Sequence, residues 1–401
     1  MGSPSVLAFV MAGGEGTRLH PLTEMLPKPG LPFGGCYRLI DFVLSNLYNS
    51  QIRAVYVLLQ HRPQVLLDHI VGSWANSSDG RDEFMTPVLP ASTPARGPFH
   101  GTAHAVHQCL HLVEEHAPDL VAVFAADHLY RMDVRQMVHF HEERGADASV
   151  AAVPVPIERA SSFGIIEADD RDQIRGFQEK PVQPAPLPRA HGQAYASMGN
   201  YLFNPRVLIR ALRAATERGE SDFGRHVLPR LIHEHKVFAY DFSRNVVPGV
   251  NGEEPAYWRD VGTVGAYVDA HRDLLGTKPK FKLENHKWRV YCGETRCFEE
   301  DIGKGRIRNS ILAAGAVARD ASLRDSIVQR GAQVDAGAEL NDCIIMEGVR
   351  VRRGARLRGV LVGGPNTIAE GASIGHDHKA DARRYPATPA GMIVIPPQSA
   401  C

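Results

Sequence analysis

Aliphatic residues at fixed spacing near the C-terminus restrict the fold more than any other feature of the chain. Within each group of three the step is six residues, and five residues separate one group from the next, so each group repeats after seventeen residues. Such steps are typical of a parallel β-helix, in which each coil stacks its aliphatic side chains on those of the coil below. An α-helix would need steps of three and four residues. The positions are Ile311, Val317 and Leu323; Val328, Val334 and Leu340; Ile345, Val351 and Leu357; and Val362, Ile368 and Ile374.

The N-terminal two thirds of the chain have a different pattern, in which short apolar runs alternate with segments of helical spacing. Buried strands that alternate with helices predict an α/β, Rossmann-like domain with a mostly parallel sheet. A charged, irregular segment then leads to the repeat. We predict strands at 6–11, 54–59, 120–125 and 148–153, and helices at 103–115 and 134–143. We predict an α/β domain over 1–275, a linker over 276–305, a β-helix over 306–376 and a C-terminal tail over 377–401.

The charge balance limits the classes of partner. Lys and Arg number 45, as do Asp and Glu, and the formal net charge is zero. This argues against a nucleic acid or an anionic membrane surface as partner, because both are held mainly by long-range charge. The apolar run at 6–11 lacks a basic segment before it and a cleavage site after it, and no run approaches the ~20 residues of a membrane span. We therefore expect a soluble, cytoplasmic protein.

A glycine-rich segment follows the first predicted strand. Met11-Ala-Gly-Gly-Glu-Gly-Thr-Arg-Leu19 is not a P-loop, and it matches only half of the GxGxxG pattern of dinucleotide-binding proteins. Glycines at this place let backbone N–H groups approach a phosphate closely. Arg18 can bind two oxygens at once and Lys28 adds a point charge, which suits a triphosphate.

Together with motifs further along, this segment resembles the signature of the sugar-nucleotide pyrophosphorylases, and specifically of the ADP-glucose pyrophosphorylases, the bacterial glucose-1-phosphate adenylyltransferases. The resemblance runs from about residue 6 to 395 and implies a nucleotidyltransferase domain (1–275) followed by a left-handed parallel β-helix of hexapeptide-type coils (306–376). The motifs include Pro27-Lys-Pro29, Tyr37-Arg-Leu-Ile-Asp-Phe42, Gly101-Thr-Ala103, Ala126-Asp-His-Leu-Tyr130, Met132-Asp133, Glu179-Lys-Pro181, Ala196-Ser-Met-Gly199, Ser221-Asp-Phe-Gly224 and Tyr257-Trp-Arg-Asp-Val-Gly-Thr263.

The resemblance implies a Mg²⁺-dependent enzyme that transfers a nucleoside monophosphate from an NTP to a glucose-like 1-phosphate and releases pyrophosphate; ATP and glucose 1-phosphate would give ADP-glucose. Asp127 directly follows a predicted parallel strand. It therefore lies at the carboxyl end of that strand, where α/β folds place their ligands. Two carboxylates that also leave room for phosphate oxygens suit Mg²⁺. The implied catalytic residues are Arg18, Lys28, Asp127 and Lys180, and the metal ligands are Asp127 and Asp260. The implied nucleotide-binding residues are Ala12, Gly13, Gly14, Gly16, Thr17, Gln60, Gly101 and Thr102, and those for the sugar phosphate are Glu179, Lys180, Ser197, Gly199 and Asp222.

Several positions depart from the family pattern. His104 replaces an aspartate, Pro98-Phe99 replaces an aromatic pair near the nucleotide, and Cys36 replaces a lysine that helps to bind sugar-phosphate activators in bacterial members. These departures leave open a second function, that of a GTP- or ATP-dependent cyclitol (valienol) 1-phosphate nucleotidyltransferase of aminocyclitol biosynthesis.

Two alternatives from other classes also stay open. One is a non-catalytic regulatory subunit, against which the intact Asp127, Lys180 and Asp260 argue. The other is an acyltransferase role for the β-helix, which would need a catalytic histidine, and the candidates are His376 and His378. The family suggests a homo-oligomer, either a tetramer or a dimer.

Overall fold

The computed structural model describes residues 3–74, 83–95, 97–188, 190, 192–250, 256–293 and 306–398. The chain forms two compact units that interleave along the sequence. The first unit comprises residues 1–13, 43–126 and 130–258, and the second comprises residues 14–42, 127–129 and 259–401. The domain limits predicted above stay a prediction; within the predicted linker, residues 294–305 lie outside the described part of the chain.

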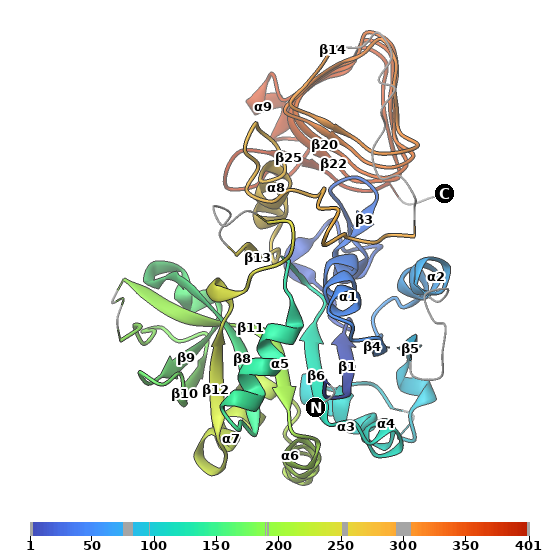
Figure 1. Ribbon diagram of the computed structural model, residues 1–401. Helices are drawn as coiled ribbons and strands as arrows, with labels where there is room; N and C mark the ends of the chain where they lie inside the picture. Colours follow the sequence, from blue (N-terminus) through green and yellow to red (C-terminus); the bar gives the residue numbers. More distant parts are fainter. Residues whose placement is uncertain are drawn as a thin grey trace. The chain divides into compact units, whose positions relative to one another are not determined.

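The first unit is built on one mixed sheet (Figure 1). Its strands follow the order β10-β9-β11-β6-β1-β4-β5, and β8 pairs with both β11 and β12. The segment β6-β1-β4-β5 is parallel, whereas β11 runs antiparallel to β6, β8 and β9. The strands are β1 (Val6–Met11), β4 (Ala54–Leu58), β5 (Phe84–Val88), β6 (Leu120–Ala125), β8 (Ala148–Pro156), β9 (Gly164–Ala168), β10 (Ile174–Glu179), β11 (Gln193–Phe203) and β12 (Val237–Asp241).

Helices pack against this sheet around an apolar core, which includes side chains of β1, β6, β8, β11 and β12 and of the helices α3, α4, α6 and α7. The strands in this core are nearly continuous apolar runs, as expected for strands that are covered on both faces. The helices are α1 (Leu39–Asn49), which begins in the second unit, α2 (Gln64–Ser73), α3 (Thr102–Gln108), α4 (Leu110–His116), α5 (Val134–Glu143), α6 (Pro205–Glu217) and α7 (Leu228–Glu234).

The predicted helix over 103–115 is two helices, because the chain leaves the helical conformation at Cys109. There φ is −105° and ψ is 10°, and the Cys109 N–H donates to the carbonyl of Val106, one residue nearer than in an α-helix. Helical spacing continues across the break, so the sequence pattern did not reveal it.

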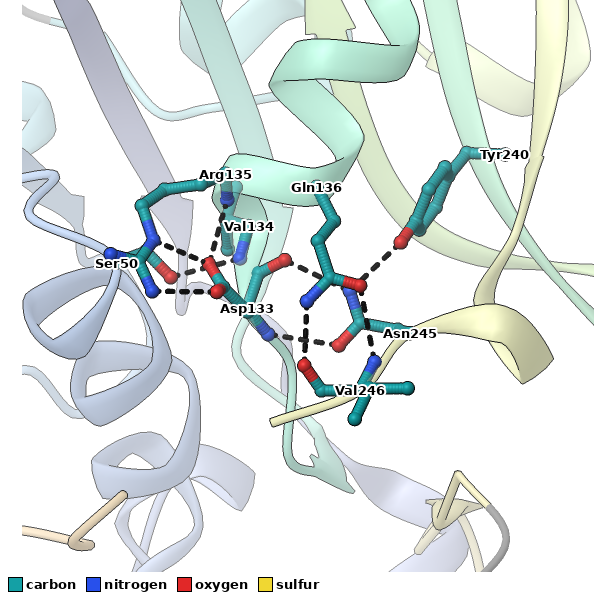
Figure 2. Close-up of polar contacts among 8 residues, drawn as sticks. All are labelled: Ser50, Asp133, Val134, Arg135, Gln136, Tyr240, Asn245 and Val246. Atoms are coloured by element: carbon teal, nitrogen blue, oxygen red, sulfur yellow. Dashed lines mark hydrogen bonds and ion pairs between the residues drawn. The ribbon is translucent and has the colours of Figure 1, made fainter. Parts of the chain in front are cut away.

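A polar network fixes the start of α5 (Figure 2). Asp133 caps this helix: its Oδ1 accepts from the N–H of Arg135 at 3.0 Å, and its Oδ2 pairs with that residue's guanidinium at 2.6 Å. Asn245 accepts from the Asp133 N–H and donates to its carbonyl, both at 2.9 Å, and donates to the Tyr240 hydroxyl at 2.8 Å. The motif Met132-Asp133 thus has a structural role at a helix N-terminus.

Stacked coils form most of the second unit (Figure 1), and the strands described in them pair with one another in parallel. From Leu323 onward the register follows the predicted seventeen-residue repeat, since Leu323 pairs with Leu340 and Leu340 with Leu357. The strands are β14 (Arg306–Arg308), β15 (Ile311–Leu312), β16 (Val317–Ala318), β17 (Ser322–Arg324), β18 (Ile327–Val328), β19 (Gln333–Val334), β20 (Glu339–Ile345), β21 (Val349–Val351), β22 (Arg356–Val362), β23 (Asn366–Ile368), β24 (Ser373–Ile374) and β25 (Ile393–Ile395).

In the first coil the predicted phase is wrong by one residue. Leu312 and Ala318, rather than Ile311 and Val317, align with Val328 and Val334, and this repeat is sixteen residues long. The turn between β16 and β17 has one residue fewer than the equivalent turn of the next coil. Val317 is consequently 40% exposed, whereas Ala318 is buried.

At the other end of the coils, β25 pairs with β22 and so extends the stack with residues from the predicted tail. Helix α9 (His378–Asp381) lies between β24 and β25 in the sequence. Helix α8 (Val264–Arg272) is joined to the coils by a salt bridge of 2.6 Å between Arg272 and Asp342. Among the described residues, no helix is both long enough and apolar enough to cross a membrane.

Candidate active site

The glycine-rich segment reaches the second unit at Gly14, and its geometry requires a glycine at position 16. Gly16 has φ of 70° and precedes the short helix η1 (Thr17–Leu19). A methyl group on Gly16 would lie 2.9 Å from Cβ of Lys28 and 3.3 Å from Cγ2 of Thr23. The Thr23 hydroxyl also donates to the Gly16 carbonyl at 2.8 Å. The glycine therefore permits both the left-handed backbone and the close approach of Lys28.

Lys28 is buried, and its ammonium group lies between two carboxylates. It opens the short helix η2 (Lys28–Gly30). Its Nζ lies 3.0 Å from Oδ2 of Asp127 and 3.4 Å from Oδ1 of Asp260. The structure therefore brings together three of the predicted site residues from distant parts of the sequence.

Strand pairing positions the two aspartates. Asp127 lies two residues beyond the end of β6, and the chain continues into β7 (His128–Tyr130), which pairs with β13 (Trp258–Asp260). The candidate ligand atoms of Asp127, His128 and Asp260 lie within 4.8 Å of one another. We call Lys28, Asp127, His128 and Asp260 the acidic cluster.

Electrostatics keeps Asp127 ionised. Desolvation alone would raise the pKa of this carboxyl, but the nearby His128 and Lys28 outweigh it and hold the pKa of Asp127 well below its usual range. Its side chain is 38% exposed, and that of Asp260 is 22% exposed. The cluster thus offers charged oxygens that an incoming ion can reach.

Arg18 lies beside the acidic cluster at Gly262. A methyl group on Gly262 would be 2.9 Å from Oδ2 of Asp260 and 3.1 Å from Nη2 of Arg18. The side chain of Arg18 is exposed, and Thr17 beside it is exposed as well. Because Gly262 has no side chain, the Arg18 guanidinium and the Asp260 carboxylate can both lie close to its backbone.

In the first unit, Lys180 and Glu179 form an ion pair where β10 ends. Nζ of Lys180 lies 2.7 Å from Oε1 of Glu179, and the lysine side chain is 49% exposed. Lys180 has φ of 49°, and its N–H donates to the carbonyl of Phe163 at 3.0 Å. The left-handed conformation turns the chain at this lysine, directly after the strand.

Several residues predicted for the sugar phosphate act electrostatically on the buried Tyr201. Burial raises the pKa of this tyrosine; its hydrogen bond with Ser197 acts in the opposite direction, and the carboxylates of Asp222 and Glu179 raise it further. Asp222 also accepts from the Thr102 hydroxyl at 3.2 Å. We call Glu179, Ser197, Tyr201 and Asp222 the Tyr201 cluster.

Other predicted residues lie near the Tyr201 cluster or close to the end of β1. Gly199 has φ of 70°, and its N–H donates to the Ser197 hydroxyl at 3.3 Å. The N–H of Ala12 donates to the carbonyl of Leu58, and a methyl group on Gly13 would meet Cβ of Gln60 at 3.4 Å.

Two hydrogen bonds to the backbone of Phe99 hold the side chain of Gln60. Its amide nitrogen donates to the Phe99 carbonyl at 3.1 Å, and its amide oxygen accepts from the Phe99 N–H. Phe99 is one of the departures from the family pattern, so the changed pair contacts a predicted nucleotide-binding residue. Gly101 approaches Ser221 so closely that a methyl group would lie 2.5 Å from the Ser221 carbonyl oxygen.

The sequence patterns did not predict the roles of two residues of these clusters, of Gly262 beside the acidic cluster, or of one cysteine contact. His128 and Gly262 stand within motifs of the family that predict no role for them, and Tyr201 lies outside those motifs. Adjacency to Asp127 was a signal for His128, whereas tertiary contacts alone reveal Tyr201. Cys36, expected only as a departure from the family, has its Sγ 3.1 Å from Sγ of Cys292.

Comparison with known proteins agrees with this architecture. Residues 7–277 match the nucleotidyl transferase family, and residues 295–395 match the GlmU-like C-terminal hexapeptide family. The predicted fold class, an α/β domain with a mostly parallel sheet and a C-terminal left-handed β-helix, is confirmed.

Curated relatives align over nearly the whole chain. A glucose-1-phosphate adenylyltransferase of Thermodesulfovibrio yellowstonii is 45% identical over 395 residues, which cover 98% of this chain and 96% of the relative. Proteins of the same name from Geobacter metallireducens and Thermus thermophilus are 40% and 42% identical. Each of these two alignments covers 98% of this chain, and they cover 97% and 98% of the relatives.

Proposed function

Because the chain belongs to the family of glucose-1-phosphate adenylyltransferases, we propose that it transfers AMP from ATP to glucose 1-phosphate, giving ADP-glucose and pyrophosphate. A phosphate oxygen of the sugar phosphate attacks the α-phosphorus of ATP in line. The bond between the α-phosphorus and its bridging oxygen to the β-phosphate breaks, and pyrophosphate leaves with the electron pair. The observation that carries the proposal is the convergence of Lys28, Asp127 and Asp260.

A divalent ion suits the acidic cluster. Two carboxylates with reachable oxygens form a donor set for Mg²⁺, and the Lys28 ammonium that lies between them supports the choice of a cation at this point. Asp127 and Asp260 would hold the ion. When bound, Mg²⁺ neutralises phosphate charge and polarises the α-phosphate.

The side chains of this protein supply the positioning and the remaining charge. Arg18 and Lys28 bind the departing pyrophosphate, and the backbone N–H groups of the glycine-rich segment from Gly13 to Thr17 contact the triphosphate, whereas Ala12 orders the start of that segment through its bond to Leu58. Lys180 binds the attacking phosphate. No covalent nucleophile is needed, because aligned reactants and compensated charge account for the rate of such phosphoryl-type transfers.

The Tyr201 cluster suits a polyol. Glu179, Ser197 and Asp222 offer hydrogen-bonding oxygens to sugar hydroxyls, and the Gly199 backbone completes this side. A site that pairs each hydroxyl discriminates strongly against a substrate that lacks one. Gln60, Gly101 and Thr102 are assigned to the nucleotide, with Gln60 at the base.

A screen of pyrophosphate release tests the proposal. The purified protein would be assayed with ATP, GTP, UTP, CTP and dTTP against glucose 1-phosphate and valienol 1-phosphate, with Lys180→Ala as a matched inactive variant. We expect release with ATP and glucose 1-phosphate. Release with the valienol substrate alone would instead support the cyclitol alternative. Absence of release with every pair would support a regulatory subunit.

The resemblance also suggests a homotetramer or dimer and a cytoplasmic location, and both stay predictions. Sedimentation of the purified protein would measure its mass in solution.

A further inference from the structure

The acidic cluster contains a third potential ligand besides its two aspartates. His128 immediately follows Asp127 in the chain, on the strand that pairs with β13. Its Nε2 lies 3.5 Å from Oδ1 of Asp127 and 3.8 Å from Oδ1 of Asp260. Adjacent ligands of an octahedral ion with bonds of ~2.1 Å lie ~3 Å apart, so small side-chain movements would let one ion touch all three atoms.

The oxygens of the two aspartates are divided between two neighbours, Lys28 and His128. Lys28 contacts Oδ2 of Asp127, whereas His128 contacts Oδ1 of the same carboxylate. Oδ1 of Asp260 is shared by Lys28 and His128. An ion can therefore enter on the His128 side without first displacing Lys28 from Oδ2 of Asp127.

The His128 side chain is largely buried, with 14% of it exposed. Its neighbour Asp127 is 38% exposed, so the ring nitrogen is held in place beside a carboxylate that solvent can reach. A preorganised imidazole beside two carboxylates is a donor set that binds Mn²⁺ and Co²⁺ more tightly than Mg²⁺, since imidazole nitrogen suits transition metals better than it suits Mg²⁺.

We propose that His128 Nε2 is the third protein ligand of the divalent ion, and that it gives this site a preference for Mn²⁺ or Co²⁺ over Mg²⁺. The proposal rests on the metal-dependent function proposed above. It assigns His128 a role in binding the ion, while Lys28 remains available for the pyrophosphate.

Electron paramagnetic resonance of bound Mn²⁺ tests the proposal without measuring activity. The full-length protein would be titrated with MnCl₂ alone, and the bound ion examined by pulsed spectroscopy for the modulation of a directly coordinated ¹⁴N nucleus. We expect that modulation in the wild type and in His111→Gln, an exposed histidine of α4. In His128→Gln we expect it to disappear and the Kd for Mn²⁺ to rise about tenfold, with a smaller rise for Mg²⁺ measured by competition.

The outcomes separate this proposal from the proposed function. Bound Mn²⁺ without ¹⁴N modulation in the wild type, or unchanged modulation in His128→Gln, would overturn the role of His128 and leave the two-aspartate site intact. Mn²⁺ binding that survives both Asp127→Asn and Asp260→Asn would instead overturn the metal site itself. Absence of Mn²⁺ binding by the wild type overturns both. Circular dichroism of each variant would establish that it is folded.

Discussion

The acidic cluster and the Tyr201 cluster each contain two carboxylates, yet their surroundings differ. In the acidic cluster a buried lysine contacts both carboxylates, and a histidine ring lies against the same pair. In the Tyr201 cluster only Glu179 has a lysine partner among the contacts described, and that lysine is half exposed. Asp222 instead accepts hydrogen bonds from the Thr102 hydroxyl and from the N–H of Arg225.

The difference indicates two kinds of recognition. Two carboxylates beside a buried lysine suit a metal ion and the phosphate groups, on which charge develops during the reaction. Carboxylates that accept neutral hydrogen bonds suit hydroxyl groups, whose charge does not change. Substitutions in the acidic cluster should therefore lower kcat, whereas those in the Tyr201 cluster should raise KM for the sugar phosphate.

The largest expected effect is that of Asp127→Asn. The amide keeps the size of the side chain but removes the charge, so we expect kcat/KM to fall roughly a thousandfold, with most of the loss in kcat. Pyrophosphate release measures it. Asp269→Asn, an exposed position in α8, is the matched control and should be nearly silent. Turnover of Asp127→Asn near that of the control would contradict the difference between the clusters.

Gly262→Ala tests the geometry of the acidic cluster without changing a charged group. The added methyl would meet the Asp260 carboxylate at 2.9 Å and the Arg18 guanidinium at 3.1 Å. We expect a loss in kcat/KM of roughly a hundredfold, because displaced charged groups no longer align the phosphates. Gly265→Ala in α8 is the control, since a methyl there meets nothing within 4 Å. Equal activity of the two variants would mean that the packing at Gly262 is irrelevant.

Ser197→Ala should affect substrate affinity instead. Loss of one hydroxyl partner is expected to raise KM for the sugar phosphate about tenfold, while KM for the nucleotide and kcat change little. Initial-rate kinetics with each substrate varied in turn would measure this, with the exposed Ser162→Ala as control. A fall in kcat without a change in KM would contradict the expectation that the Tyr201 cluster acts on substrate affinity and not on turnover.

The smallest expected effect concerns stability, and it is shared by both units. Each unit has a buried, neutral histidine: burial lowers the pKa of His141 and of His271 to about 4. His271 Nε2 accepts from the N–H of Gly34 and is 3.3 Å from the amide nitrogen of Gln329, and its Nδ1 faces the Tyr267 carbonyl at 2.9 Å, so the ring has no place for a second proton.

Because the unfolded chain binds these protons near pH 6.5 and the folded chain does not, stability is lost as the pH falls from 6.5 towards 4. At pH 5 the loss is about 2 kcal/mol for each histidine. Urea unfolding at pH 7.5 and pH 5.0 measures it. His141→Gln should flatten this dependence by about half; a pH-independent wild type would contradict the neutral state of both rings.

Much of the fold and of the candidate site was predictable because it depends on local patterns. Strands β1 and β6 begin and end where their apolar runs do, and α5 has the limits that its helical spacing predicts. The coil register from Leu323 onward follows from a strict repeat. The glycines that directly follow the first strand predicted a phosphate-binding segment around Gly16. The motifs of the family predicted roles for Asp127, Lys180 and Asp260.

The sequence by itself determined the architecture and the family, because apolar periodicity and motif order are properties of the linear chain. Only the tertiary structure decided that Lys28 lies between Asp127 and Asp260, that His128 lies against the same two carboxylates, and that Ser197, Asp222 and Glu179 act on Tyr201. It also decided the phase of the first coil, where one missing turn residue moves Val317 outward. Such contacts join residues that are far apart in the chain or depend on the length of a single turn, so no local pattern encodes them.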